Sequence, residues 1–165
     1  MYAFAYERPT SMADALAKIS AGGQALAGGQ TLIASLKQRL AQPESLIDLA
    51  GVAELSGIRK EGNTLVIGAM TRHETVADSA EVQAAIPALA ALAGGIGDRQ
   101  VRAMGTLGGS VANNDPAACY PSAVLALGAT ITTTQRKITA DDFFTGMFST
   151  ALAENEIITA TRLAR

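Results

Sequence analysis

Two glycine-rich segments, each leading into residues that begin a helix, constrain this chain more than any other feature. Residues 26–32 read LAGGQTL and follow a short apolar run that predicts a buried strand. Residues 104–118 read MGTLGGSVANNDPAA and again combine glycines with small hydroxyl and amide side chains. Glycine lets the backbone approach a ligand closely and adopt positive φ, and free amides ahead of a helix suit a phosphate. Two such loops predict a grip on the two phosphates of a dinucleotide from both sides.

Several better-known nucleotide and hydrolase motifs are excluded. No Gly-Lys-Ser/Thr follows the first glycine pair, so it is not a P-loop, and no Gly-x-Gly-x-x-Gly occurs anywhere in the chain. Ser110 does not sit in a Gly-x-Ser-x-Gly elbow, which argues against a hydrolase. One alternative stays open from the residues alone, namely that both glycine clusters serve only turns and packing.

The periodic segments predict a chain that mixes helices and strands. Strands are expected over 2–6, 24–27, 45–50, 130–134, 137–138 and 157–161, with a hairpin joining 57–60 to 64–70. Helices are expected over 12–19 with Ser11 as cap, from Thr31 to about Leu40, and from Asp78 or Ser79 to about Ala93 with a kink or break at Pro87. Asp115-Pro116 predicts the start of a further helix running to about Leu127. The fold class is therefore α+β, with a lobe boundary near residues 50–55.

Composition narrows the possible partners. The 165 residues suit one domain or two small lobes, and the net charge of −2 with no basic run argues against a nucleic acid or a membrane surface. A single cysteine rules out an internal disulfide, and with a single histidine, His73, it argues against a zinc site. His73, between Arg72 and Glu74, is expected in a solvated loop. No apolar run is long enough to span a membrane and the first residues lack signal-peptide features, so a cytoplasmic location is expected.

The paired motifs resemble the FAD-binding (medium) subunit of molybdenum hydroxylases, the family of xanthine dehydrogenase and aerobic carbon monoxide dehydrogenase. The resemblance rests on AGGQTLI at 27–33, TLGGS at 106–110 and DPAA at 115–118. Supporting stretches are IGAMT at 67–71, RQVR at 99–102, DFFTG at 142–146 and EII at 156–158, so that it runs in order from Phe4 to about Arg162.

The resemblance implies a fold and a cofactor site. The fold is a two-lobed FAD-binding domain of the vanillyl-alcohol oxidase (PCMH) type, with an N-terminal α/β lobe over 1–53 and a second α+β lobe over 54–165. The cofactor-binding residues implied are Ala27, Gly28, Gly29, Gln30, Thr31, Leu32, Thr106, Gly108, Gly109, Ser110, Cys119 and Ile158. Of these, Gly28–Thr31 and Thr106–Ser110 would hold the pyrophosphate, and Ile158 would lie near an end of FAD. Ile96 is a weaker candidate for a ring contact.

The implied function is electron transfer, with no catalytic acid, base or nucleophile and no metal ligand in this chain. In the family, a molybdopterin-binding large subunit hydroxylates the substrate, and a small subunit with two-iron two-sulfur clusters passes electrons to FAD and on to an external acceptor. The chain would thus be an oxidoreductase subunit that binds FAD and both of these partners.

Two departures from the family pattern leave alternatives open. Many relatives carry an acidic residue at the position of Cys119, where a carboxylate would bond the ribitol or ribose, and cysteine is a weaker acceptor. Cys119 is expected instead to be a small packed residue. The family also continues into a C-terminal domain, which is expected to be absent here. A truncated, non-redox assembly module is therefore a second hypothesis, and a free-standing FAD oxidase or reductase is a third.

Overall fold

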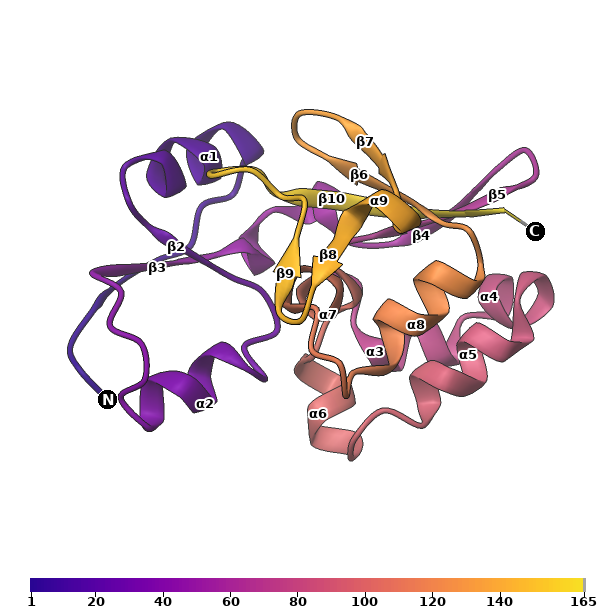
Figure 1. Ribbon diagram of the computed structural model, residues 1–165, viewed down its shortest axis with the longest axis horizontal. Coiled ribbons are helices and arrows are strands. Elements are labelled where there is room, and N and C mark those ends of the chain that lie inside the picture. The colour runs from indigo at the N-terminus through magenta and orange to yellow at the C-terminus, as the bar shows by residue number, and fades with distance from the viewer. Residues whose placement is uncertain (165) are drawn as a thin grey trace.

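A computed structural model describes residues 1–164 of the chain. These residues form a three-stranded sheet, a five-stranded sheet and a two-stranded hairpin (Figure 1). The mixed helix and sheet composition agrees with the α+β prediction.

The first third of the chain builds the small parallel sheet, in the order β1-β3-β2. Its elements are β1 Ala5–Glu7, α1 Met12–Ser20, β2 Gln24–Leu26, α2 Leu32–Lys37 and β3 Ser45–Asp48, followed by the 3₁₀ turns η1 Leu49–Gly51 and η2 Ala53–Leu55. The cap predicted for α1 is confirmed, because the Ser11 hydroxyl accepts from the Asp14 N–H at 3.2 Å. Helix α2 is shorter than expected, since it ends at Lys37 and leaves Leu40 76% exposed.

The rest of the chain builds an antiparallel sheet in the order β4-β5-β10-β6-β7. Its strands are β4 Ile58–Glu61, β5 Thr64–Gly68, β6 Thr130–Thr133, β7 Lys137–Thr139 and β10 Ile158–Ala164. The predicted hairpin is confirmed, with Gly62 at φ 60° in its turn. The last strand lies in the middle of the sheet, so the end of the described chain locks the sheet together.

Helices cover one face of this sheet (Figure 1). They are α3 His73–Asp78, α4 Ala80–Ala85, α5 Pro87–Gly94, α6 Arg99–Met104, α7 Leu107–Asn113 and α8 Cys119–Ala126. A short α9, Ala140–Phe143, leads into the hairpin of β8 Phe144–Gly146 and β9 Ser149–Thr150. The break at Pro87 is confirmed, and Ser79 caps α4 through Val82 N–H.

One predicted helix start is wrong. Asp115 and Pro116 do not begin α8, which starts at Cys119. Instead the Asp115 carboxylate accepts from Ala117 N–H at 2.9 Å, and its carbonyl accepts from Ala118 N–H at 2.9 Å. These bonds close a turn, and the helix begins only after it.

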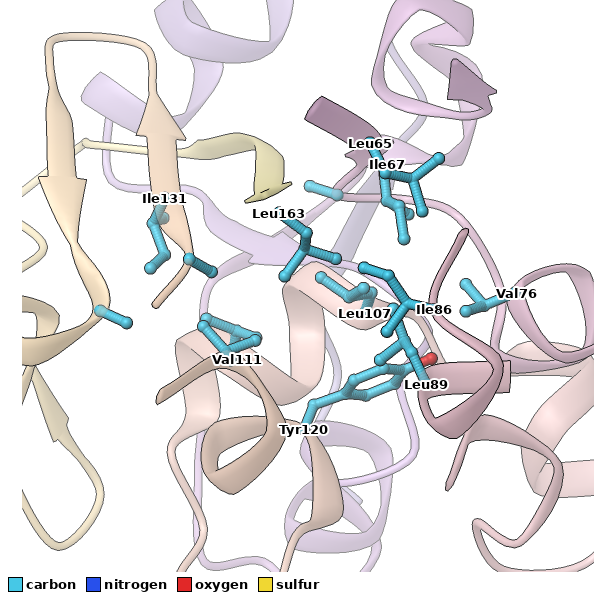
Figure 2. Close-up of a cluster of buried hydrophobic side chains, with 14 of the residues drawn as sticks. Leu65, Ile67, Val76, Ile86, Leu89, Leu107, Val111, Tyr120, Ile131 and Leu163 are labelled. Atoms are coloured by element: carbon cyan, nitrogen blue, oxygen red, sulfur yellow. The ribbon is translucent and has the colours of Figure 1, made fainter. Parts of the chain in front are cut away.

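The main apolar core lies between the five-stranded sheet and its helices. Figure 2 shows Leu65, Ile67 and Leu163 from the sheet packed toward Leu107 of α7 and Ile86, which lies between α4 and α5. A second cluster joins α1 and β3 to η2, Met70 and Ile157, so apolar packing links the two sheets.

Candidate functional site

The two glycine motifs lie against each other. A Cβ atom at residue 28 would stand 2.3 Å from the carbonyl oxygen of Met104 and 2.6 Å from the Cα of Gly105. A Cβ at residue 109 would stand 3.2 Å from the Cβ of Ala27. Only glycine at 28 permits this approach. Segments some 80 positions apart in the printed sequence thus form one site at the ends of β2 and α6.

The first motif presents a row of backbone donors. The N–H groups of residues 28–32 donate to no acceptor within residues 1–164. Thr31 occupies the cap position of α2, but its side chain makes no cap hydrogen bond, contrary to the expected role. Gly29 has φ +72°, and the Gln30 amide folds back to donate to the Gly28 carbonyl at 3.2 Å. The result is an amide row suited to anionic oxygens.

The second motif has a different construction from the first. Gly108 and Gly109 lie inside α7, not in the loop before it. Thr106 caps that helix by accepting from Gly109 N–H at 3.2 Å. Gly108 is buried, donates to the Ala69 carbonyl at 2.8 Å, and would place a Cβ 2.5 Å from that of Ala69. This glycine therefore serves the close packing of α7 on the residues that follow β5.

The amides of the second motif are already used. Leu107 N–H donates to Thr71, Gly108 to Ala69, and Gly109 and Ser110 to Thr106. Among the described residues, the half-buried Ser110 hydroxyl has no hydrogen-bond partner. The two motifs are thus unequal. Within residues 1–164, the first offers a row of unpaired amides, while the second offers a wall, formed by Thr106 and Ser110, whose free polar group is the Ser110 hydroxyl.

The other candidate residues lie in different environments. Ala27 and Leu32 are half-buried beside the first motif, whereas Gln30 and Thr31 are exposed. Ile158 opens β10 inside the main core and is 3% exposed. Cys119 is exposed at the first position of α8, so the expectation that it is a small packed residue is wrong. Ile96 is half-buried, and the guanidinium of Arg102 donates to its carbonyl at 3.0 Å.

His73 differs from the expectation of a solvated side chain. It is 5% exposed at the start of α3, and its ring lies 5.2 Å from that of Tyr120. Burial lowers its pKa from 6.5 to about 4. His73 is buried by tertiary contacts, because α3 packs against Gly105 of the second motif and against Tyr120.

The sequence reasoning missed the hairpin of β8 and β9 at the far end of α7. The Asn114 side-chain amide donates to the carbonyls of Gly146 and Ser149 at 2.7 and 2.8 Å, and the backbone carbonyl of Asn114 accepts from Phe148 N–H at 3.1 Å. The tip carries Met147 and Phe148, which are 74% and 58% exposed. Asn114 has φ 44°, a conformation that asparagine tolerates better than most residues, and this is the one sequence signal for such a clamp.

The residues of the two glycine motifs fit a dinucleotide such as FAD. An amide row meets phosphate charge without lysine or arginine, and glycine at 28 leaves the backbone close to the opposite wall. Exposed apolar side chains flank the row, including Ile33, whose Cδ1 would be 2.6 Å from a Cβ on Gly29. Within residues 1–164 no group of three or more His, Cys, Asp or Glu side chains is placed to hold a metal. No helix in the same range has the length and apolar character needed to cross a bilayer.

Comparison with known proteins gives a consistent result. Residues 2–163 match the family described as the FAD binding domain in molybdopterin dehydrogenase. The chain is 41% identical over 167 aligned positions to the carbon monoxide dehydrogenase medium chain of Afipia carboxidovorans, which covers 97% of this chain and 58% of the relative. It is 36% identical to the glyceraldehyde dehydrogenase medium chain of Sulfolobus acidocaldarius, with 94% and 58% covered.

Solved structures share the fold. Carbon monoxide dehydrogenase from Hydrogenophaga pseudoflava superposes with a TM-score of 0.96 at 40% identity, over 99% of this chain and 59% of that one. The chain therefore spans less than three fifths of the length of the relatives that it matches.

Proposed function

The chain belongs to the family of FAD-binding domains of molybdopterin dehydrogenases, and from this premise we propose that it binds FAD between its two glycine motifs as part of an oxidoreductase subunit. The single observation that carries the proposal is the amide row of residues 28–32, held open against Gly105 and Gly109. No lysine or arginine is needed to meet the diphosphate.

The described residues have distinct roles in this proposal. The amide row binds the diphosphate oxygens, and the Ser110 hydroxyl donates from the opposite wall. The half-buried Ala27 and Leu32 exclude water from one side of the row. Cys119 and Ile158 would contact the cofactor farther from the diphosphate. A bound flavin supplies redox chemistry that the side chains here do not, so the chain's own role is to bind and orient it.

We also propose the two-lobed arrangement of the PCMH type, with lobes over 1–53 and 54–165. Its support is that the three-stranded sheet lies within residues 5–48, and the five-stranded sheet within residues 58–164. Residue 165 lies outside the described residues.

In the whole assembly we propose that the subunit passes electrons from iron–sulfur clusters to an external acceptor. The partners would be a molybdopterin-binding large subunit and a small subunit with two-iron two-sulfur clusters. Support comes from relatives named as medium chains of dehydrogenases. A non-redox assembly module is the alternative, and the exposed thiol of Cys119, where the resemblance implies an acid in many relatives, is the observation that favours it.

The test places a charge beside the amide row without disturbing the fold. Thr31 is exposed and its side chain makes no cap bond, so Thr31→Glu removes no cap hydrogen bond, and an acid at a helix start is favourable. The carboxylate would repel the diphosphate and compete for its amides. We expect the unaltered chain to bind FAD, and Thr31→Glu to raise the Kd about tenfold or more, which is about 1.4 kcal/mol.

Thr31→Gln is the matched control, because it has similar bulk and no charge, and it should stay within about threefold of the unaltered chain. Flavin fluorescence titration of the purified chain measures all three values. An unaltered chain that cannot be loaded with FAD, while still joining the large and small subunits, would support the assembly module. Equal affinity in Thr31→Glu would show that the diphosphate lies elsewhere.

A further inference from the structure

His73 is buried in an apolar setting with part of its polarity unmet. Its Nδ1 atom and the hydroxyl of its ring neighbour Tyr120 have no hydrogen-bond partner among the described residues. Figure 2 shows the Tyr120 ring among the apolar side chains of the main core. Burying an unpaired polar atom costs free energy that an apolar side chain would not. Such an exception calls for a reason beyond core packing.

The imidazole of His73 packs against Gly105, in the second glycine motif. The backbone N–H of His73 donates to the Gly105 carbonyl at 3.0 Å. A Cβ on Gly105 would stand 2.5 Å from His73 Nε2 and 2.8 Å from its Cδ2, so residue 105 rests directly on the ring. The ring therefore sets how far Gly105 extends toward the first motif.

Gly105 also contacts the first motif. A Cβ on Gly28 would stand 2.6 Å from the Gly105 Cα and 3.0 Å from its carbonyl carbon. The contacts thus run from the imidazole through Gly105 to Gly28, where the amide row begins. Neither Gly105 nor Gly28 has a side chain that could absorb a displacement of the ring.

We propose that His73 is a positioning residue for the diphosphate, in that its ring fixes the separation between the amide row of residues 28–32 and the wall formed by Thr106 and Ser110. The inference rests on the proposed function, because it assumes that FAD binds between these two motifs. His73 does not touch the diphosphate, and it acts through Gly105.

The charge state of the ring agrees with this role. Burial alone lowers the pKa of His73 to about 4, and Tyr120, the ring packed against it, stays protonated because burial raises its pKa. Arg72 and Glu74 adjoin it in the chain but contribute nothing to its pKa. At neutral pH the ring is therefore neutral and can stay in its apolar seat.

The test compares two losses of bulk on the same helix. His73→Ala removes the support under Gly105, and we expect it to raise the Kd for FAD about tenfold or more. His73→Gln keeps a side chain that reaches Gly105 and should stay within about threefold of the unaltered chain. Val76→Ala is the matched control, because Val76 is fully buried on α3 and absent from the Gly105 stack. It should lower the melting temperature and leave the Kd unchanged.

A second measurement needs no variant. The chain contains one histidine, so its imidazole nitrogen resonances are unambiguous, and adding FAD to the unaltered chain should shift them. A folded His73→Ala variant with unchanged Kd, or resonances that do not move on saturation with FAD, would overturn the inference while the proposed function stands. Failure of the unaltered chain to bind FAD would overturn both.

Discussion

At the scale of single residues, Glu156 is the most strongly held charge in the described chain. Its side chain is fully buried and accepts from the Thr133 hydroxyl at 2.5 Å, from Arg136 Nε and Nη2 at 3.1 Å each, and from Ala153 N–H at 2.8 Å. These bonds tie the turn between β6 and β7 to the segment that enters β10. Ile158, a proposed cofactor contact, follows two residues later, so this carboxylate holds the entry of the strand that carries it.

The Glu156 carboxylate should give the fold a stability that depends on pH. The Arg136 hydrogen bond is the main cause that lowers its pKa from 4.5 to about 2. A depressed carboxylate pKa stabilises the fold fully above the unfolded value, and this stability is lost as pH falls from about 4.5 through 2. We expect Glu156→Gln to lower the free energy of unfolding at pH 7 by about 3 kcal/mol.

Urea unfolding at a series of pH values measures this effect. Glu156→Gln should lose less stability than the unaltered chain between pH 4.5 and 2, because the titrating group is gone. Glu154→Gln is the control, since Glu154 is exposed and should change little. Equal acid dependence in all three proteins would contradict the role given to the Arg136 contact.

At the scale of elements, α7 contains two glycines, Gly108 and Gly109, which lower the intrinsic stability of the helix. Glycine in a helix costs roughly 0.5–1 kcal/mol relative to alanine. At Gly108 the cost is offset by close approach, because a Cβ there would lie 2.5 Å from the Cβ and 2.8 Å from the backbone of Ala69. Helix α7 can therefore lie against the end of β5 only with glycine at this position.

Gly108 in α7 and Gly94 in α5 should respond in opposite directions to replacement by alanine. Gly108→Ala forces α7 away from Ala69, and we expect a loss of about 1–3 kcal/mol in the free energy of unfolding. Gly94→Ala, at the end of α5, meets only the Cβ of Ala77 at an ordinary 3.8 Å and should gain up to about 1 kcal/mol. Thermal denaturation of both variants decides this, and a neutral Gly108→Ala would show that α7 has room to spare.

At the scale of the whole molecule, one apolar cluster spans the two sheets. Ala15, Ile19 and Ile47 from the small sheet and its helix pack with Leu55, Met70 and Ile157 from the segments around the large sheet. The first glycine motif follows β2 of the small sheet, and the second lies on helices that pack with the large sheet. The cluster therefore keeps the two motifs facing each other. The amide row and its opposite wall should therefore form together when the chain folds.

We expect the two sheets to unfold in one transition. Leu55 is 1% exposed within the shared cluster, so Leu55→Ala should lower the free energy of unfolding by about 2–5 kcal/mol and keep a single transition. Leu40→Ala is the control, since Leu40 is 76% exposed and should change little. Calorimetry tests this by comparing the calorimetric and van't Hoff enthalpies, and two separate transitions would contradict the coupling.

The sequence by itself determined much of the local structure and the family. The Ser11 and Ser79 caps, the hairpin around Gly62 and the break at Pro87 all follow from residues within a few positions of one another. The ordered glycine motifs likewise pointed to the family that the comparison confirmed. In each case the signal is local, because caps and turns are hydrogen bonds between near neighbours.

Only the tertiary structure decided which groups of the site are available. The sequence predicted two similar cradles, yet the amides of the second are used by Thr71, Ala69 and Thr106 while those of residues 28–32 are not. The sequence predicted a solvated His73 and a packed Cys119, whereas in the structure His73 is buried and Cys119 is exposed. The physical reason is that burial and hydrogen-bond occupancy depend on the approach of segments distant in sequence. That approach is set by packing at positions such as Gly28, Gly105 and Gly108, and a glycine in the sequence does not say what will fill the space beside it.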